Sequence, residues 1–217
     1  FDDTNFILSE LKLNYNYVKN DKNWIVYNQI MMFGKIAKTM TEVRDEQRMT
    51  IENRCNKAVE LASNHETSVY WCNFNDEGEL LQQLDKSAYQ IKGSMDLDKK
   101  EDILLNFANG NIKKLITKPK MTAFGLNWQH CNHTVYFPTW SYERYYQAIR
   151  RFWRFGQQYK VIVDLVLSDG QKRVIDALLL KTEKAIELFD LLNLNLHKHL
   201  ELSKTEFTKE IIKPKFI

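Results

Sequence analysis

Hydrophobic residues occur in short runs through the middle of the chain, and longer stretches with helical periodicity lie between these runs. The runs are rich in β-branched and aromatic residues, which favour strands. The stretches between them open with capping or acidic residues, as helices do. Strands are therefore expected at 68–74, 88–93, 112–118, 133–138 and 159–170, and helices at 75–85, 96–110, 141–156 and 171–192.

Strands that alternate with helices predict an α/β fold, in which a doubly wound parallel sheet carries helices on both faces. The run VIVDLVL at 161–167 is nearly all apolar, as expected for a strand that is covered on both sides. Ligands of such sheets bind beyond the carboxyl ends of the strands. The loops that follow 112–118 and 133–138 are therefore the first places to look for a site.

The two ends of the chain have other patterns. Alternation in ELKLNYNYV (10–18) predicts an edge strand, and spaced apolar residues across 30–62 predict one or two amphipathic helices. The end of the chain is rich in Lys and Glu. We therefore divide the chain into an edge strand with a helical lead-in (1–65), a main domain that ends in a C-terminal helix (66–192), and a polar tail (193–217).

The charge of the chain is unevenly distributed. The net charge is only +3 over 217 residues, yet residues 110–160 hold nine lysines and arginines against one glutamate. A basic zone of this kind suits a cleft that faces phosphates, and a solvated basic surface would have the same composition. Charge alone does not separate these two interpretations.

Composition also bears on the compartment. No apolar run approaches the roughly 18 residues of a membrane span. The three cysteines, Cys55, Cys72 and Cys131, have no spacing typical of a disulfide framework. We expect a protein of the reducing cytoplasm without contact to a membrane.

The stretch QAIRRFWRFGQ (147–157) places fixed positive charge beside aromatic rings. On a helix with about 100° per residue, Gln147, Arg151 and Arg154 share one stripe. The opposite side holds the apolar residues Tyr142, Tyr145, Ile149, Phe152 and Trp153. Neighbouring guanidinium groups repel one another, whereas a bound polyphosphate would be clasped by both. Pairing with acidic residues elsewhere is the alternative.

The same stretch resembles motif VI of superfamily 2 helicases and translocases, in the form Q-A-x-x-R-x-x-R-x-G-Q of the Swi/Snf-type branch. LITKPKMTAFGLNWQHCNHTVYF (115–137) resembles motif V of the Swi/Snf-like helicases of phages and prophages. WCNFNDE (71–77) resembles motif IV, and IKGS (91–94) the block that follows it. The four blocks stand in the correct order, and the resemblance covers roughly 66–170.

The resemblance implies a RecA-like fold and roles for individual residues. Arg154 would be the arginine finger at the γ-phosphate of ATP, with Arg151 beside it and Gln147 positioning an arginine or the attacking water. Two residues of motif V, Gly125 and Asn127, would link the nucleotide to the nucleic-acid groove. Contacts to the DNA backbone are expected from Lys118, Ser94 and Asn73.

The resemblance also implies a partner domain. Such motors have two RecA-like domains, and the first supplies the phosphate-binding loop and the Asp-Glu box for Mg²⁺. Neither GxxxxGK[ST] nor D-E-x-[HD] occurs in this sequence. The chain is therefore expected to be the second domain of a monomeric ATP-dependent DNA helicase or translocase from a bacterial or phage-infected cell. The preceding domain would bind most of ATP and Mg²⁺. The alternative is a RecA-like module that binds nucleic acid or regulates without hydrolysing ATP.

Three further features have simpler interpretations. His130, Cys131 and His133 lie within four residues, but no second group of ligands complements them, so we expect packing or surface placement and no metal site. Asp164 interrupts an apolar strand and would pair with a nearby arginine or face solvent. The helical segment 31–62 could dock on DNA or on the other domain, and packing against its own domain is the interpretation we favour.

Overall fold

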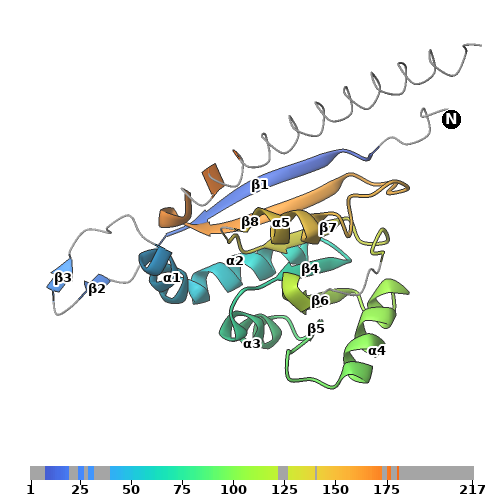
Figure 1. Cartoon of the computed structure of the whole chain (residues 1–217), viewed down its shortest axis with the longest axis horizontal. Coiled ribbons are helices and arrows are strands. Elements are labelled where there is room, and N and C mark those ends of the chain that lie inside the picture. Colours follow the sequence, from blue (N-terminus) through green and yellow to red (C-terminus); the bar gives the residue numbers. More distant parts are fainter. Residues whose placement is uncertain are drawn as a thin grey trace, which may run out of the picture. The chain divides into compact units, whose positions relative to one another are not determined.

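The computed structural model describes residues 8–19, 24–26, 29–31, 40–121, 127–139, 141–172, 175, 176 and 180 (Figure 1). The chain divides into two compact units, Phe1–Asp176 and Ala177–Ile217, and the first contains all the elements discussed below. Most of the helix predicted at 171–192 and the whole tail at 193–217 lie outside the described residues. The domain limits at 65 and 192 remain predictions.

A six-stranded sheet forms the centre of the first unit, in the order β1-β8-β7-β4-β6-β5. Every adjacent pair in it is parallel. Its strands are β1 (Leu11–Val18), β4 (Ser68–Trp71), β5 (Ala88–Gln90), β6 (Lys114–Thr117), β7 (His133–Tyr136) and β8 (Val161–Ser168). The predicted α/β fold with a parallel sheet is confirmed, and the strand predicted at 10–18 lies at one edge.

The helices connect these strands as a βαβ arrangement requires. They are α1 (Met40–Met49), α2 (Ile51–Ser63), α3 (Asn75–Leu84), α4 (Leu97–Ala108) and α5 (Tyr142–Ile149), with short 3₁₀ turns η2 (Pro119–Met121) and η3 (Asp169–Gln171). A separate antiparallel pair, β2 (Trp24–Val26) and β3 (Gln29–Met31), was not expected from the sequence.

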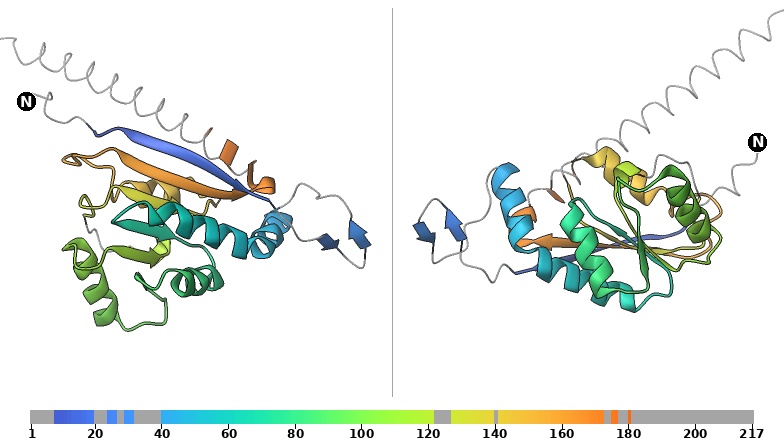
Figure 2. Two further views of the ribbon diagram at one scale, coloured as in Figure 1. Left: turned by 180° about the vertical axis from the view of Figure 1, so that it is seen from behind. Right: turned by 90° about the horizontal axis from the view of Figure 1, so that it is seen from below.

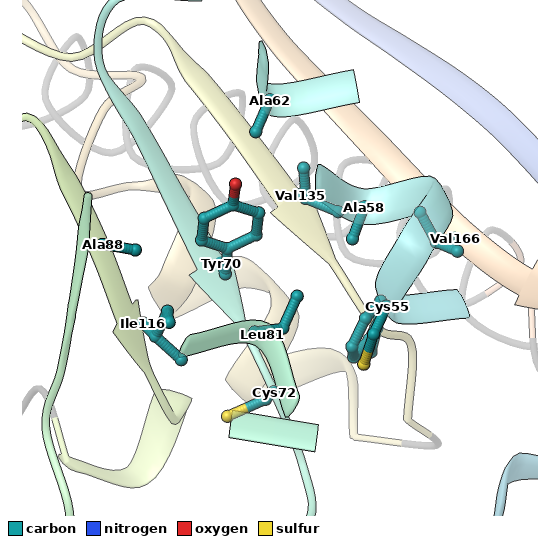
Figure 3. Packing of buried hydrophobic residues seen from close by; sticks show 11 residues of the cluster. Cys55, Ala58, Ala62, Tyr70, Cys72, Leu81, Ala88, Ile116, Val135 and Val166 are labelled. Atoms are coloured by element: carbon teal, nitrogen blue, oxygen red, sulfur yellow. The ribbon is translucent and has the colours of Figure 1, made fainter. Parts of the chain in front are cut away.

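One face of the sheet packs on α2 and α3 (Figure 3). Small residues of α2, Cys55, Ala58 and Ala62, lie against alternate strand residues such as Tyr70 and Val135. Alternate residues of a strand point to opposite faces. The small side chains let α2 approach the sheet closely. The register of the strands decides which strand residues face α2.

An aromatic cluster fills the other face, which α4 and α5 cover (Figure 2). The ring of Trp71 in β4 lies 5.8 Å from that of Trp128, and Phe152 lies 6.3 Å from Trp71. Phe107 of α4 contacts Trp128 edge-on at 5.3 Å. All four side chains are buried. Phe152, placed on the apolar side of the predicted helix, is thus buried in this cluster.

The helix predicted at 141–156 ends at Ile149. Beyond it the chain forms turns up to Gly156, which adopts φ +91°. The backbone N–H of Trp128 donates to the carbonyl of Arg151 at 3.2 Å, and Phe152 inserts into the aromatic cluster. Both contacts come from outside the helix, and tertiary packing therefore shortens a helix that the local sequence would extend.

Asp164 pairs with a histidine, not with an arginine. Its carboxylate lies 2.9 Å from Nε2 of His133 and accepts hydrogen bonds from Asn14 and Asn16 at 2.9 and 3.1 Å. The other ring nitrogen of His133 lies 2.8 Å from the Ser68 hydroxyl. Burial raises the pKa of Asp164, but the hydrogen bonds outweigh it and leave the pKa below its ordinary value. This network attaches β1 to the sheet.

Candidate functional site

The arginines of the sequence QAIRRFWRFGQ gather around one open depression. Six residues line its volume of about 520 Å³: Tyr146, Gln147, Arg150, Arg151, Arg154 and Phe155. The stripe predicted from helical geometry is thus brought together, although the last two arginines of the sequence lie in the turns after α5. Tyr146 and Phe155 add two exposed rings to its rim.

The electrostatics of this depression favour an anion. Burial and the neighbouring charge of Arg154 lower the pKa of Arg151, whose guanidinium lies 6.0 Å from the centre of the Trp128 ring. Arg150 lies over the ring of Tyr146 at 5.7 Å. Two guanidinium groups that disfavour each other's charge are stabilised when an anion binds between them.

Gln147 is the neutral member of the group. Its amide donates to the carboxylate of Glu143 at 3.1 Å, one helical turn earlier on α5. This contact directs the Glu143 carboxylate to the glutamine. The interaction holds the amide on the surface of α5 that also borders the arginines.

The arginine depression lies near the amino ends of the strands. Trp153 donates its indole N–H to the carbonyl of Ser9, just before β1, at 2.7 Å. Gln157 donates to the carbonyl of Gln129, shortly before β7, at 3.0 Å. The arginines follow α5, and α5 returns the chain from the carboxyl ends of the strands to their amino ends. A ligand at the carboxyl ends would therefore not reach these arginines.

Asn127, from the block that resembles motif V, borders the same region. Asn127 is exposed, and its amide donates to the side chain of Gln129 at 2.8 Å. Gln129 in turn donates to the carbonyl of Phe155. Asn127 is thus connected through one side chain to the residue after Arg154. Gly125, the other predicted member, lies outside the described residues.

A second cavity lies at the carboxyl ends of β4, β6 and β7. Its volume is about 580 Å³, and its walls come from the loops after these strands and from α1. We call it the cationic groove, because Arg44, Lys118, Lys120 and Arg144 line it and none of its described lining residues is acidic. In Figure 1 the arrowheads of β1 and β8 point toward α1, which marks the same end of the sheet.

Two of the three predicted DNA contacts line the cationic groove. Asn73 donates its amide to the carbonyl of Phe137 at 2.9 Å, and Lys118 donates to Asn75 at 2.6 Å. Ser94 is exposed after β5 and does not belong to the groove lining. The structure therefore brings Asn73 and Lys118 together and leaves Ser94 apart.

A buried ion pair supports the groove from behind. Nη1 of Arg54 in α2 lies 2.8 Å from the carboxylate of Glu77 in α3, and both side chains are fully buried. The other Glu77 oxygen accepts the backbone N–H groups of Asn73 and Phe74 at 2.7 and 3.0 Å. Arg54 also donates to the carbonyl of Gln47, near the end of α1. One pair thus fixes two walls of the groove.

Sequence reasoning missed the contribution of α1. The segment 31–62 was interpreted as packing, and α1 does pack, yet Thr41, Val43, Arg44 and Gln47 line the groove. The spacing of Arg44 and Arg48, four residues apart, was the available signal, since such residues share a helix face. Nothing in the sequence showed which element that face would meet.

No metal site is found in the described part of the chain. No group of three His, Cys, Asp or Glu side chains there could hold an ion. Cys131 and His133 are buried, and the Cys131 sulfur contacts the carbonyl of His133 at 3.2 Å, whereas His130 is exposed. Among the described residues, no helix has the length and apolar character needed to cross a bilayer.

Comparison with known proteins identifies the family. The helicase conserved C-terminal domain matches residues 35–156, more than half of the chain, and the chain belongs to this family. No protein of curated function matches the sequence significantly.

Two solved structures show the same fold. The C-terminal part of the Fun30 ATPase domain matches with a TM-score of 0.50 and 17% identity, over 57% of this chain and 44% of that one. The E. coli DEAD-box protein SrmB, crystallised with regulator of ribonuclease activity A, matches with a TM-score of 0.50 and 14% identity, over 59% and 78%. The parallel sheet is thus that of RecA-like helicase C-terminal domains. The chain spans less than half of the Fun30 structure.

Proposed function

We propose that the chain is the second RecA-like domain of an ATP-dependent DNA helicase or translocase of the Swi/Snf type. The observation that carries this proposal is the arginine depression, where Gln147, Arg151 and Arg154 meet on one surface. Its chemistry matches a polyphosphate, and the chain belongs to a helicase family. Helicase C-terminal domains work beside a preceding RecA-like domain, which would supply the rest of the nucleotide pocket.

In this proposal Arg154 acts on a nucleotide held by the other domain. A guanidinium that approaches the γ-phosphate stabilises the charge that develops there during transfer to water. Arg151 holds a second phosphate oxygen, and Gln147 orients an arginine or the attacking water. The position near the amino ends of the strands suits this role, because an arginine finger works across a domain interface rather than within its own sheet.

The cationic groove would bind the DNA backbone. Lys118 and Asn73 offer an ammonium and an amide to phosphate oxygens, and backbone contacts of this kind carry no sequence information. Asn127 and Gly125 would connect the groove with the nucleotide. Ser94 remains a candidate contact outside the groove itself.

Mg²⁺ fits this part of the chain poorly. The described residues offer no cluster of carboxylates, and Mg²⁺ is held through carboxylates and substrate phosphates. The phosphate-binding loop and the magnesium ligands are therefore assigned to the preceding domain. This chain contributes guanidinium and amide groups to the shared pocket.

The decisive test is ATP turnover by the intact protein that contains this chain, with Arg154→Ala. Loss of an arginine finger should lower kcat by roughly 10³- to 10⁵-fold. ATP binding, followed with a fluorescent ATP analogue, should persist, because the other domain holds most of the nucleotide. Arg154→Lys tests the planar fork and should restore only a small part of the turnover.

Lys99→Ala is the matched control. Lys99 on α4 is well exposed, and its contact with Asp96 is 3.8 Å long, so its loss should leave turnover unchanged. Unaltered turnover in Arg154→Ala would reject the arginine-finger assignment. An intact protein that binds DNA but does not hydrolyse ATP would instead be the non-hydrolysing module considered above.

A further inference from the structure

Helix α1 lines the cationic groove from outside the four sequence blocks that resemble helicase motifs. Its residues Thr41, Val43, Arg44 and Gln47 share the groove with residues from the ends of β4, β6 and β7. Arg44 is exposed, and it is the one cation of α1 among the lining residues. One turn later, the guanidinium of Arg48 lies 5.8 Å from the centre of the Phe74 ring, which also borders the groove.

Buried hydrogen bonds hold α1 in this place. The Gln47 amide donates to the carbonyl of Pro138 at 3.3 Å, and the Glu46 carboxylate accepts the backbone N–H of Gly170 at 2.7 Å. Both side chains are buried. Since Arg44 is one turn from Gln47 on the same helix face, this contact aims Arg44 at the groove. A rigid helix presents a guanidinium more precisely than a loop does.

We propose that α1 is a nucleic-acid-binding element and that Arg44 binds a backbone phosphate in the cationic groove. This inference rests on the proposed function. It assigns DNA binding also to α1, the wall of the groove that precedes the first helicase-like block in the sequence. The ligand is a phosphodiester chain, because the described lining residues include four cations and no carboxylate around a volume of about 580 Å³. A guanidinium can hold two oxygens of one phosphate.

Charge at this position is also separable from stability. Arg44 is exposed, and the contacts that hold α1 come from Glu46, Gln47 and Arg54. Truncation of Arg44 therefore removes a groove cation and leaves the contacts that hold α1 intact. Urea unfolding of Arg44→Ala should give the midpoint of the unsubstituted protein, which establishes that a binding defect is not a folding defect.

The test is binding of fluorescein-labelled duplex and single-stranded DNA to the intact protein, by anisotropy, between 50 and 200 mM salt. The plot of log affinity against log salt has a negative slope, and loss of one phosphate contact should make it shallower by about 0.7 to 0.9. Binding should weaken by roughly five- to tenfold near 0.1 M salt. Arg44→Lys should restore the slope, since it keeps the charge. Lys57→Ala, on α2 beside Glu60, is a control outside the groove lining and should change neither quantity.

The outcomes separate this inference from the proposed function. If Lys118→Ala makes the salt dependence shallower and Arg44→Ala does not, α1 does not contact a phosphate, while the proposal that the groove binds DNA is retained. If Arg44→Ala weakens binding of ATP or pyrophosphate but not of DNA, the groove serves a small anion and the inference fails. If the intact protein binds no DNA at all, the inference and the proposed function fail together.

Discussion

The ion pair of Arg54 and Glu77 makes the sharpest stability prediction, because it is completely buried and joins three parts of the domain. Arg54→Met keeps most of the apolar volume and removes the guanidinium. It eliminates the 2.8 Å ion pair, the hydrogen bond at 3.2 Å to the Thr50 hydroxyl, and the contact at 4.8 Å with the Phe137 ring. Glu77 keeps its two backbone N–H donors but loses its counterion.

The expected cost follows from that uncompensated charge. Breaking a buried pair by removing one partner destabilises proteins by about 3–5 kcal/mol. For a chain of this size each kcal/mol shifts Tm by about 2–4 °C, so Tm should fall by roughly 6–20 °C. Adding Glu77→Gln removes the buried charge, and its amide oxygen can still accept from the backbone. The double variant should therefore be more stable than Arg54→Met alone.

Urea unfolding of the 217-residue chain, followed by circular dichroism, measures these free energies of unfolding. Lys92→Met is the matched control. Lys92 pairs at 3.1 Å with Glu79, which lies on α3 as Glu77 does, but both side chains of this pair are about half exposed. That change should cost about 1 kcal/mol or less. The reasoning fails if Arg54→Met costs no more than the control, or if the two substitutions of the buried pair are simply additive.

Three further changes test other contacts. Gly170→Ala would place its Cβ 1.8 Å from the buried Glu46 carboxylate, so chemical denaturation should show a loss of about 1–3 kcal/mol. Burial and the ring of His133, stacked at 3.7 Å, lower the pKa of His65. Stability should therefore decline as pH falls through the ordinary histidine range near ~6.5, and urea titrations at several pH values should show a weaker decline in His65→Phe. Trp153→Phe loses a hydrogen bond to Ser9, which thermal unfolding should register as about 1 kcal/mol.

The inner strands of the main domain were predictable because β4, β7 and β8 are buried on both faces. The run VIVDLVL is apolar except for Asp164, and β8 is buried along nearly its whole length. Helices α3 and α4 match the predicted ranges within a few residues, and the acidic residues in their first turns are a local signal of where a helix begins. Local chemistry therefore determines where these elements begin and end.

Tertiary contacts decided what local patterns could not. The end of α5 depends on Trp128, whose backbone bonds to the carbonyl of Arg151 from outside the helix. The partner of Asp164 depends on strand register, which places His133 and Asn14 beside it. The charge pattern indicated one basic zone at 110–160, but not that its residues divide between two sites at opposite ends of the strands.

That separation gives α5 a particular place in the molecule. Arg144, in its first turn, lines the cationic groove, whereas Gln147 and the residues just after its last turn line the arginine depression. The helix has eight residues, a length of about 12 Å. Because Ala148 and Ile149 are buried and close-packed interiors resist deformation, we expect α5 to move as one body. A tilt of this helix therefore displaces a groove cation and the amide beside the arginines together. The two sites share a rigid element despite lying at opposite ends of the strands.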